Sequence, residues 1–219
     1  MKKENIFIKL ENVFPFDIKM QYPILGMKSA VTECFLRYEV YELLKKAAAN
    51  LPEGYRFRIW DAWRPLSLQK ELYEFYRKSL IDNFDLSALS EDEQNKFISK
   101  YIAIPSEDPS SPPAHTTGGA IDITLIDAQG NEVDMGTGFD DFSEKAATDY
   151  FETAELKNSV AGKNRRILKN AMTSAGFTNL PSEWWHYDYG NRNWASYSGN
   201  EVIYKGVFIQ ENLIFEVLS

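Results

Sequence analysis

The hydrophobic positions along the chain change their spacing several times, and each spacing predicts a different element. Apolar residues recur three and four positions apart over residues 29–50, which predicts an amphipathic helix. Residues 55–60 alternate instead, so a strand with Tyr55, Phe57 and Ile59 on one face is expected next. A second helix is predicted after Pro65, on an apolar stripe formed by Leu68, Leu72, Phe75, Tyr76 and Leu80.

The rest of the chain continues with the same two patterns. A capping box at Ser90 and Glu93 predicts a short helix, and the proline-rich residues 104–113 predict an irregular loop. Residues 120–126 alternate as a strand, with Asp122 on the face opposite Ile121, Ile123 and Leu125. We further predict a helix over 159–175 ended by Gly176, a strand over 183–189, and one or two strands within 201–217.

Helices and short strands follow one another without a strict strand–helix–strand order. This favours an α+β fold over a doubly wound sheet. A linker between domains would be a long stretch rich in proline, glycine, serine or charged residues, and the sequence has none between its periodic regions. We therefore expect residues 1–219 to form a single domain.

Composition and charge narrow the classes of function. With 44% hydrophobic and 26% charged residues, the chain can bury a sizeable core. The net charge of −8 and the scattered basic residues argue against a nucleic-acid partner. The single cysteine, Cys34, excludes an intramolecular disulfide and is expected to be a packed thiol. No stretch resembles a membrane span, and charged residues interrupt the amino-terminal segment where a signal peptide would be apolar, so a cytoplasmic location without membrane contact is expected.

The two histidines, His115 and His186, stand in the most informative surroundings. The pair Gly118-Gly119 lets the chain turn, so that His115 can fold back over the strand that carries Asp122. Two imidazoles and one carboxylate would leave a fourth zinc position open for water or substrate, as in catalytic sites. Each of these residues alone also has an ordinary explanation, since a histidine on a strand is commonly packed and an aspartate commonly bonds locally.

Glu183 is the candidate for taking a proton from a zinc-activated water. Residues three apart in a regular strand point to opposite faces, so Glu183 and His186 would diverge there. We expect Glu183 to lie in the turn after Pro181, from which both side chains can reach one site.

Several motifs in register resemble those of the zinc D,D-peptidases, a fold shared with the amino-terminal domain of hedgehog proteins. The run HTTGGAID at 115–122 resembles the family signature H-x-x-G-x-A-x-D, and EWWH at 183–186 resembles the D-alanyl-D-alanine dipeptidase branch. Residues 60–65 (WDAWRP) and 134–140 (DMGTGFD) resemble two further segments, as do 164–166 and 175–177 near the second metal motif. The resemblance covers about residues 29 to 190. It implies a central, mostly antiparallel sheet flanked by helices.

The resemblance also implies roles for individual residues. His115, Asp122 and His186 match the ligands of one zinc ion per chain, and Glu183 matches the catalytic base. Arg64 matches the arginine that steadies the oxyanion, where a fixed guanidinium is most effective in a dry site. Asp140 matches the carboxylate that binds the substrate ammonium. Its neighbour Asp141 lies one position too late in the motif.

The chain departs from the family in one place near the first ligand. Pro113 replaces a serine that helps to line the pocket, and Ser110, Ser111, Thr116 or Thr117 are alternative hydroxyls. Tyr22 and Tyr38 are candidates for lining the pocket from the amino-terminal side. The predicted activity is hydrolysis of D-Ala-D-Ala, with cell-wall D,D-carboxypeptidase or L,D-peptidase activity as the alternative and a non-enzymatic zinc module as a third reading. The sequence leaves the oligomeric state open.

Overall fold

The strands of the protein form two sheets in the computed structural model, which describes residues 6–153 and 155–215. The larger sheet has five strands in the order β2-β4-β5-β7-β6, and the β2–β4 pair is parallel while the other pairs are antiparallel. Its members are β2 (Phe16–Ile18), β4 (Arg56–Asp61), β5 (Ala120–Ile126), β6 (Thr178–Asn179) and β7 (His186–Asp188). The smaller sheet, in the order β3-β1-β8, consists of β1 (Ile6–Leu10), β3 (Cys34–Arg37) and β8 (Ile214–Phe215).

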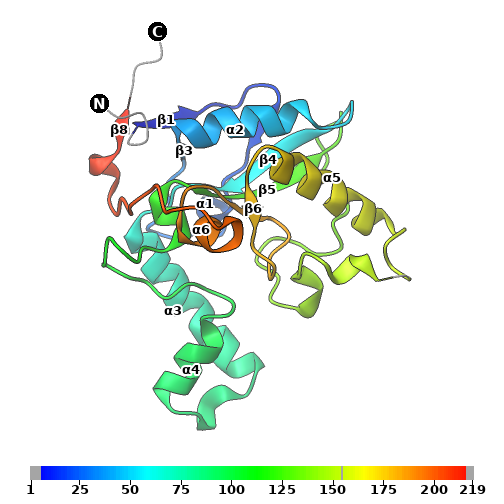
Figure 1. Cartoon of the computed structure of the whole chain (residues 1–219). Helices are drawn as coiled ribbons and strands as arrows, with labels where there is room; N and C mark the ends of the chain where they lie inside the picture. The colour runs from blue at the N-terminus through cyan, green and yellow to red at the C-terminus, as the bar shows by residue number, and fades with distance from the viewer. Residues whose placement is uncertain (1–5, 154, 216–219) are drawn as a thin grey trace.

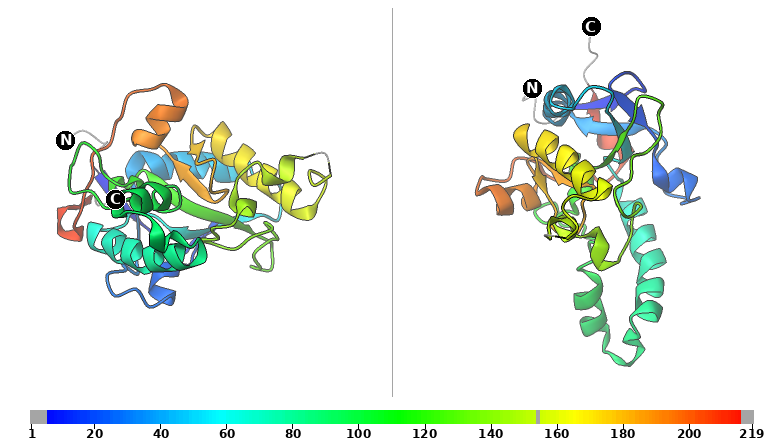
Figure 2. Two further views of the ribbon diagram at one scale, coloured as in Figure 1. Left: turned by 90° about the horizontal axis from the view of Figure 1, so that it is seen from below. Right: turned by 90° about the vertical axis from the view of Figure 1, so that its right-hand side faces the viewer.

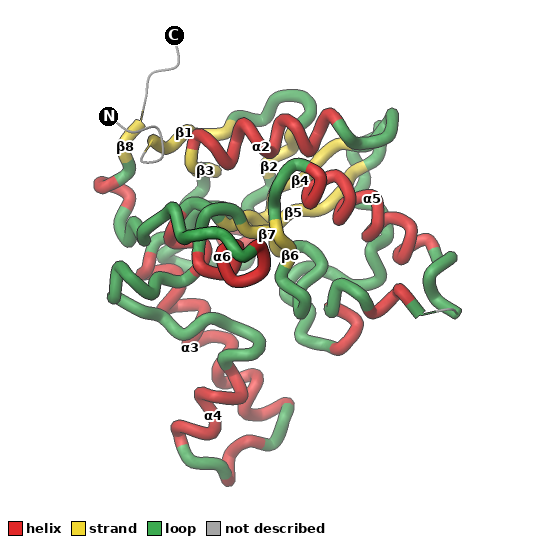
Figure 3. Tube along the Cα trace, in the orientation of Figure 1, coloured by secondary structure: helices red, strands yellow, loops and turns green. Residues whose placement is uncertain are grey.

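Helices alternate irregularly with these strands along the chain (Figure 3), which confirms the predicted α+β class. The α-helices are α1 (Gln21–Ile24), α2 (Tyr38–Ala49), α3 (Leu66–Asn83), α4 (Glu91–Ile98), α5 (Val160–Ser174) and α6 (Arg192–Ser198). Short 3₁₀ turns are η2 (Leu86–Ala88), η3 (Ala114–Thr117), η4 (Glu144–Ala146), η5 (Tyr150–Glu152) and η6 (Gln210–Asn212). The Ser90–Glu93 capping box is present, and Gly176 follows α5 with a φ of +107°.

The main core lies between the five-stranded sheet and the pair α2 and α5, which lie side by side (Figure 1). The fully buried Ile121, Ile123 and Leu125 of β5 join Leu44 of α2 and Leu168 of α5 in one cluster. Each such side chain contributes about 1.5–3 kcal/mol through burial. The alternation of β5 then leaves Asp122 on the opposite face of the sheet.

The carboxyl-terminal half of α3 and the helix α4 project from the rest of the molecule as a helical pair (Figure 2). A separate small core holds the pair together, built from Tyr73, Leu80, Leu86 and Ile98. Phe75, which we expected on the buried stripe of this helix, is instead 58% exposed.

Long-range pairing overrides the predicted helix over 29–50. Residues 34–37 form β3, which pairs antiparallel with β1, and the helix begins only at Tyr38. Every residue of β3 is buried, so its apolar run fits a strand covered on both faces as well as a helix stripe. Cys34 is a buried thiol as expected, whereas β1, β2 and α1 were not predicted.

Two carboxyl-terminal predictions also need correction. The strand predicted over 183–189 is limited to β7, because residues 181–185 form turns. Within 201–217 the described part contains only the short β8, and residues 216 and 217 lie outside the described residues. Among the residues described, no helix has both the length and the apolar composition needed to cross a bilayer.

Candidate active site

Three neighbouring strands bring Asp61, Asp122 and His186 into one row on the face of the sheet opposite α2 and α5. Asp122 of β5 lies opposite Asp61 of β4 on one side and opposite His186 of β7 on the other. The register of β4 against β5 shifts between Ile59 and Asp61, so a bulge places the Asp61 side chain in this row. The row is buried, since each of the three residues is at most 4% exposed.

His115 reaches the same row from η3, as the sequence predicted. Gly118 ends this 3₁₀ turn with a φ of +72°, and a Cβ atom there would lie 2.3 Å from the ring of Phe7, so glycine is required. The carbonyl oxygen of Ala62 lies 2.7 Å from Nδ1 of His115 and fixes the ring. Nε2 of His115 then lies 3.2 Å from Nδ1 of His186 and 3.4 Å from Oδ2 of Asp122.

His115, Asp122 and His186 form a group that could hold a metal ion. One donor atom from each lies within 4.8 Å of the others, and all three residues are buried. Two imidazole nitrogens that face each other need a shared proton or a cation between them, so the donor set fits a metal. Burial opposes ionisation of Asp122, but the two histidines outweigh it and hold the pKa of Asp122 well below its usual range.

Asp188 supports His186 from the side away from the triad. Its Oδ2 lies 3.1 Å from Nε2 of His186, and the residue is completely buried. Asn191 donates to Oδ1 over 2.5 Å and Asn193 donates to Oδ2 over 3.2 Å. Burial lowers the pKa of His186, but Asp188 and Asp122 outweigh this effect and hold it above its usual range.

Glu183 lies in the turn after Pro181, as predicted from the strand geometry. Its backbone N–H donates to the carbonyl of Leu180, and its Oε2 lies 3.8 Å from Nδ1 of His186. Burial and the negative charge of Asp122 raise the pKa of Glu183 to about 8, against the opposing effect of His186. The turn therefore resolves the expected divergence of the two side chains.

Arg64 is buried and held by three side chains. Its Nε donates to Oδ2 of Asp61 over 3.0 Å, its Nη2 forms an ion pair with the same oxygen at 2.8 Å, and its Nη1 donates to Gln69 over 2.8 Å. It also donates to the Tyr22 hydroxyl over 3.1 Å, and it lies 3.8 Å from Asp122. A guanidinium fixed in this way presents its charge to the cavity without reorganising.

Asp140 accepts a hydrogen bond from the same Tyr22 hydroxyl that contacts Arg64. Its backbone lies in the left-handed region, at a φ of +53°. Tyr22 of α1 and Tyr76 of α3 donate to its Oδ2 over 3.1 and 2.8 Å. Burial and the charge of Asp122 raise the pKa of Asp140 to about 6, although Tyr76, Arg64 and Tyr22 oppose the shift.

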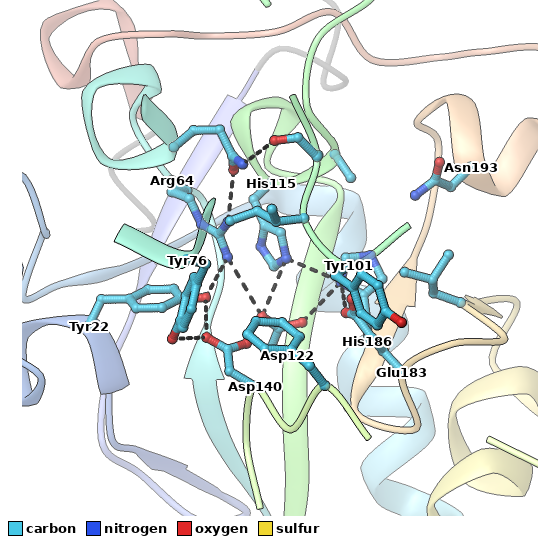
Figure 4. A pocket seen from close by; sticks show the side chains of 16 residues that line it. Tyr22, Arg64, Tyr76, Tyr101, His115, Asp122, Asp140, Glu183, His186 and Asn193 are labelled. Atoms are coloured by element: carbon cyan, nitrogen blue, oxygen red, sulfur yellow. Dashed lines mark hydrogen bonds and ion pairs between the residues drawn. The ribbon is translucent and has the colours of Figure 1, made fainter. Parts of the chain in front are cut away.

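All six predicted site residues line one cavity of about 100 Å³. In Figure 4, Asp140, Tyr22 and Tyr76 lie on one side of Asp122, while Glu183, His186 and Asn193 lie on the other. The predicted site residues are His115, Asp122 and His186 for the metal, Glu183 and Arg64 for catalysis, and Asp140 for the substrate.

Of the other residues predicted as candidates for lining the cavity, only Tyr22 does so. Tyr38 packs against the main core instead. The hydroxyls of Thr116 and Thr117 donate to backbone carbonyls, Ser110 bonds to Asp108 and Ser111 bonds to Arg192. None of these four hydroxyl residues lines the cavity. Asp141 accepts a hydrogen bond from the Ser143 backbone and lies outside the cavity, unlike Asp140.

Several supporting residues were missed at the level of sequence. Asp61 and Asp188 stand inside or next to the recognised motifs, so their position was a usable signal. Gln69 and Tyr76 gave no such signal, because α3 presents them to the site only through its packing.

Together, the fold and the site define an α+β protein with a candidate single-metal centre, a partly buried glutamate beside it, and an arginine and an aspartate of opposite charge in the same cavity. Residues 24–203 match the model of the family described as D-ala-D-ala dipeptidase. The chain therefore belongs to this family of M15 peptidases.

Individual relatives are moderately similar to the chain. A D-alanyl-D-alanine dipeptidase of Synechocystis is 32% identical over 67% of this chain, and the match covers 64% of that relative's length. One of Enterococcus faecium is 30% identical over 68% of this chain and 70% of the relative. A structure of VanYB in complex with D-Alanine-D-Alanine has a TM-score of 0.43 and 14% identity, over 80% of this chain and 84% of that one.

Proposed function

We propose that this protein is a zinc-dependent dipeptidase that hydrolyses D-Ala-D-Ala to two molecules of D-alanine. One observation carries the proposal: the Tyr22 hydroxyl accepts from Arg64 and donates to Asp140, so it joins a cationic and an anionic group beside the metal triad. A short substrate with a free ammonium end and a nearby carbonyl is complementary to that pair. The family's described activity and the names of the relatives support the same substrate.

Zinc is the proposed ion because two imidazoles and one carboxylate are a donor set of catalytic zinc sites, with room for a further ligand. When bound, zinc supplies Lewis-acid activation of water and of the scissile carbonyl. The chain's own part is to keep the donors deprotonated and oriented. Ala62 and Asp188 contribute to this by fixing the outer nitrogens of His115 and His186.

Glu183 is the proposed general base and acid. It takes a proton from the attacking water as the oxygen forms a bond to the carbonyl carbon. It then returns this proton to the nitrogen of the leaving D-alanine, and the peptide C–N bond breaks. Burial of its carboxyl beside the triad suits this exchange, because a raised pKa keeps the proton transferable.

Arg64 and Asp140 are the proposed groups that recognise the reacting dipeptide. Arg64 donates to the oxygen that gains negative charge, where a preorganised donor is worth about 3–4 kcal/mol. Asp140 accepts from the substrate ammonium, which would otherwise be buried without a partner. The alternative is D,D-carboxypeptidase or L,D-peptidase activity on cell-wall stem peptides, whose amino end is blocked or extended.

The test is release of D-alanine from D-Ala-D-Ala by the zinc-loaded protein, with and without a chelator. N-acetyl-D-Ala-D-Ala and a stem-like tripeptide serve as parallel substrates, and the Glu183→Gln variant serves as the inactive control. Chelator-sensitive cleavage confined to the free dipeptide is the expected result. Cleavage of the blocked or longer peptides in preference would favour the carboxypeptidase alternative, and no cleavage despite bound zinc would contradict both.

A further inference from the structure

The active-site cavity and a second hollow share part of their lining. Tyr76, Asp140 and Phe142 line the cavity of about 100 Å³, and the same three residues line an outer hollow of about 640 Å³. The outer hollow also borders the exposed Phe75 and other residues of α3. The three shared side chains therefore form a partition between the active-site cavity and a larger outer space.

Tyr76 is held in this partition by both parts of its side chain. The hydroxyl donates to Oδ2 of Asp140 over 2.8 Å. The ring packs edge-on against Phe142, with centroids 4.9 Å apart and planes at 83°, and similarly against Phe75 at 5.1 Å and 80°. Burial and the charge of Asp140 raise the pKa of Tyr76 above its usual value, so the phenol keeps the proton that it donates.

We propose that Tyr76 is a specificity-determining residue that limits the substrate at its amino end. Its hydroxyl orients Asp140 towards the ammonium, and its ring blocks the passage that an amino-terminal extension would need. This inference rests on the proposed dipeptidase function, because it assigns the amino end of the substrate to Asp140.

The geometry of Asp140 supports the first half of the proposal. Both phenols, Tyr22 and Tyr76, donate to Oδ2, so within the described residues Oδ1 is the oxygen that faces no phenol donor and can accept from an ammonium. The Tyr76 hydrogen bond also contributes most among the effects that lower the pKa of Asp140. Loss of this bond would leave the carboxylate both less fixed and less readily charged.

The size of the ring supports the second half. A group attached to the substrate nitrogen must continue past Asp140, and the outer hollow is the space available beyond the partition. Removal of the ring would join the two spaces, whereas removal of the hydroxyl alone would leave the partition closed. Phenylalanine and alanine at position 76 therefore separate the two roles.

The experiment compares Tyr76→Phe, Tyr76→Ala and the control Tyr73→Phe in the zinc-loaded protein. Tyr73 lies one turn earlier on α3 and donates to Asn95, outside the cavity. The substrates are D-Ala-D-Ala and N-acetyl-D-Ala-D-Ala, and kcat and KM are measured from D-alanine release. Thermal unfolding of each variant checks that it is folded.

For Tyr76→Phe we expect KM for the free dipeptide to rise about tenfold, as for the loss of a hydrogen bond to a charged group, with a smaller effect on kcat. For Tyr76→Ala, kcat/KM for the acetylated peptide should rise at least about tenfold over the unaltered protein. Unchanged KM in Tyr76→Phe, or the same changes in Tyr73→Phe, would overturn the proposal. If Tyr76→Ala does not fold, the KM of Tyr76→Phe decides. Failure of the unaltered protein to cleave D-Ala-D-Ala would instead contradict the proposed function itself.

Discussion

Replacing Asp188 with asparagine tests whether the buried carboxylate behind His186 strengthens metal binding. Asp188 meets three nitrogen atoms: Nε2 of His186 at 3.1 Å, Nδ2 of Asn191 at 2.5 Å and Nδ2 of Asn193 at 3.2 Å. An amide group would turn one acceptor oxygen into a donor that faces another donor. It would also remove the negative charge that makes the His186 ring a better ligand.

Loss of such a partner typically weakens metal binding 10–100-fold, or by about 1.4–2.8 kcal/mol. We therefore expect the zinc dissociation constant of Asp188→Asn to rise within this range. The assay is competition for zinc against a chromogenic chelator, which does not depend on activity. The control is Asp17→Asn on β2, two strands away from β5, which removes an ion pair with Arg58 and should leave zinc affinity unchanged.

Zinc affinity within about twofold of the unaltered protein would refute this reasoning, because it would mean that His186 binds equally well without the carboxylate. Equal loss in both variants would refute it as well, since a general loss of stability would then explain the effect. Unfolding of the zinc-free proteins, followed in urea, separates that possibility from a change at the site.

Three further predictions concern the substrate site and its support. Asp140→Asn should raise KM for D-Ala-D-Ala about 100-fold while changing kcat less, and a larger fall in kcat than rise in KM would argue against ammonium binding. The pKa of Asp140 is raised to about 6, and only its charged form attracts an ammonium, so KM should rise as the pH falls below about 6. The midpoint of this rise should move to higher pH in Tyr76→Phe, because the variant loses a hydrogen bond that favours the charged carboxylate. A KM that is flat between pH 5 and 8 would contradict this assignment. Gly118→Ala should lower the free energy of unfolding by about 2–4 kcal/mol, because the residue has a positive φ and the added Cβ would lie 2.3 Å from the Phe7 ring. A decrease below about 1 kcal/mol in urea unfolding would contradict this prediction.

The placement of the candidate metal triad was predictable because its signals are local, whereas its assignment as a ligand set came from the family resemblance. The alternation around Asp122 fixed its face of the strand, and the glycine pair after His115 allowed the required turn. The same strand geometry required Glu183 to lie in a turn, and the structure has it there. These features depend on a few neighbouring residues, so the sequence alone was sufficient for them.

The features that the sequence did not predict depend instead on contacts between distant parts of the chain. Residues 34–37 have an apolar pattern that suits a helix, yet their pairing with β1 makes them a strand. The motif around Asp61 singles the residue out, but its place in the row depends on a bulge in β4 and on the register with β5, which the local sequence does not show. Tyr76 has the spacing of a core residue, and its hydrogen bond to Asp140 joins positions 64 residues apart.

In the proposed mechanism, catalysis and substrate specificity come from different parts of this fold. The sheet carries two of the three proposed ligands, Asp122 and His186, and a rigid, hydrogen-bonded ladder suits ligands that must stay fixed. The partition proposed to limit the amino end of the substrate comes instead from α3 and from the loop that carries Asp140 and Phe142, which lie outside the sheet. Because α3 carries Tyr76 and continues into the projecting helical pair, the proposal implies that changes along α3 alter the accepted substrate length and leave the candidate metal triad intact. A variant series on α3 should accordingly shift the ratio of kcat/KM values for free and acetylated dipeptides without changing zinc affinity, and a parallel loss of zinc affinity would show that the two parts are not separable.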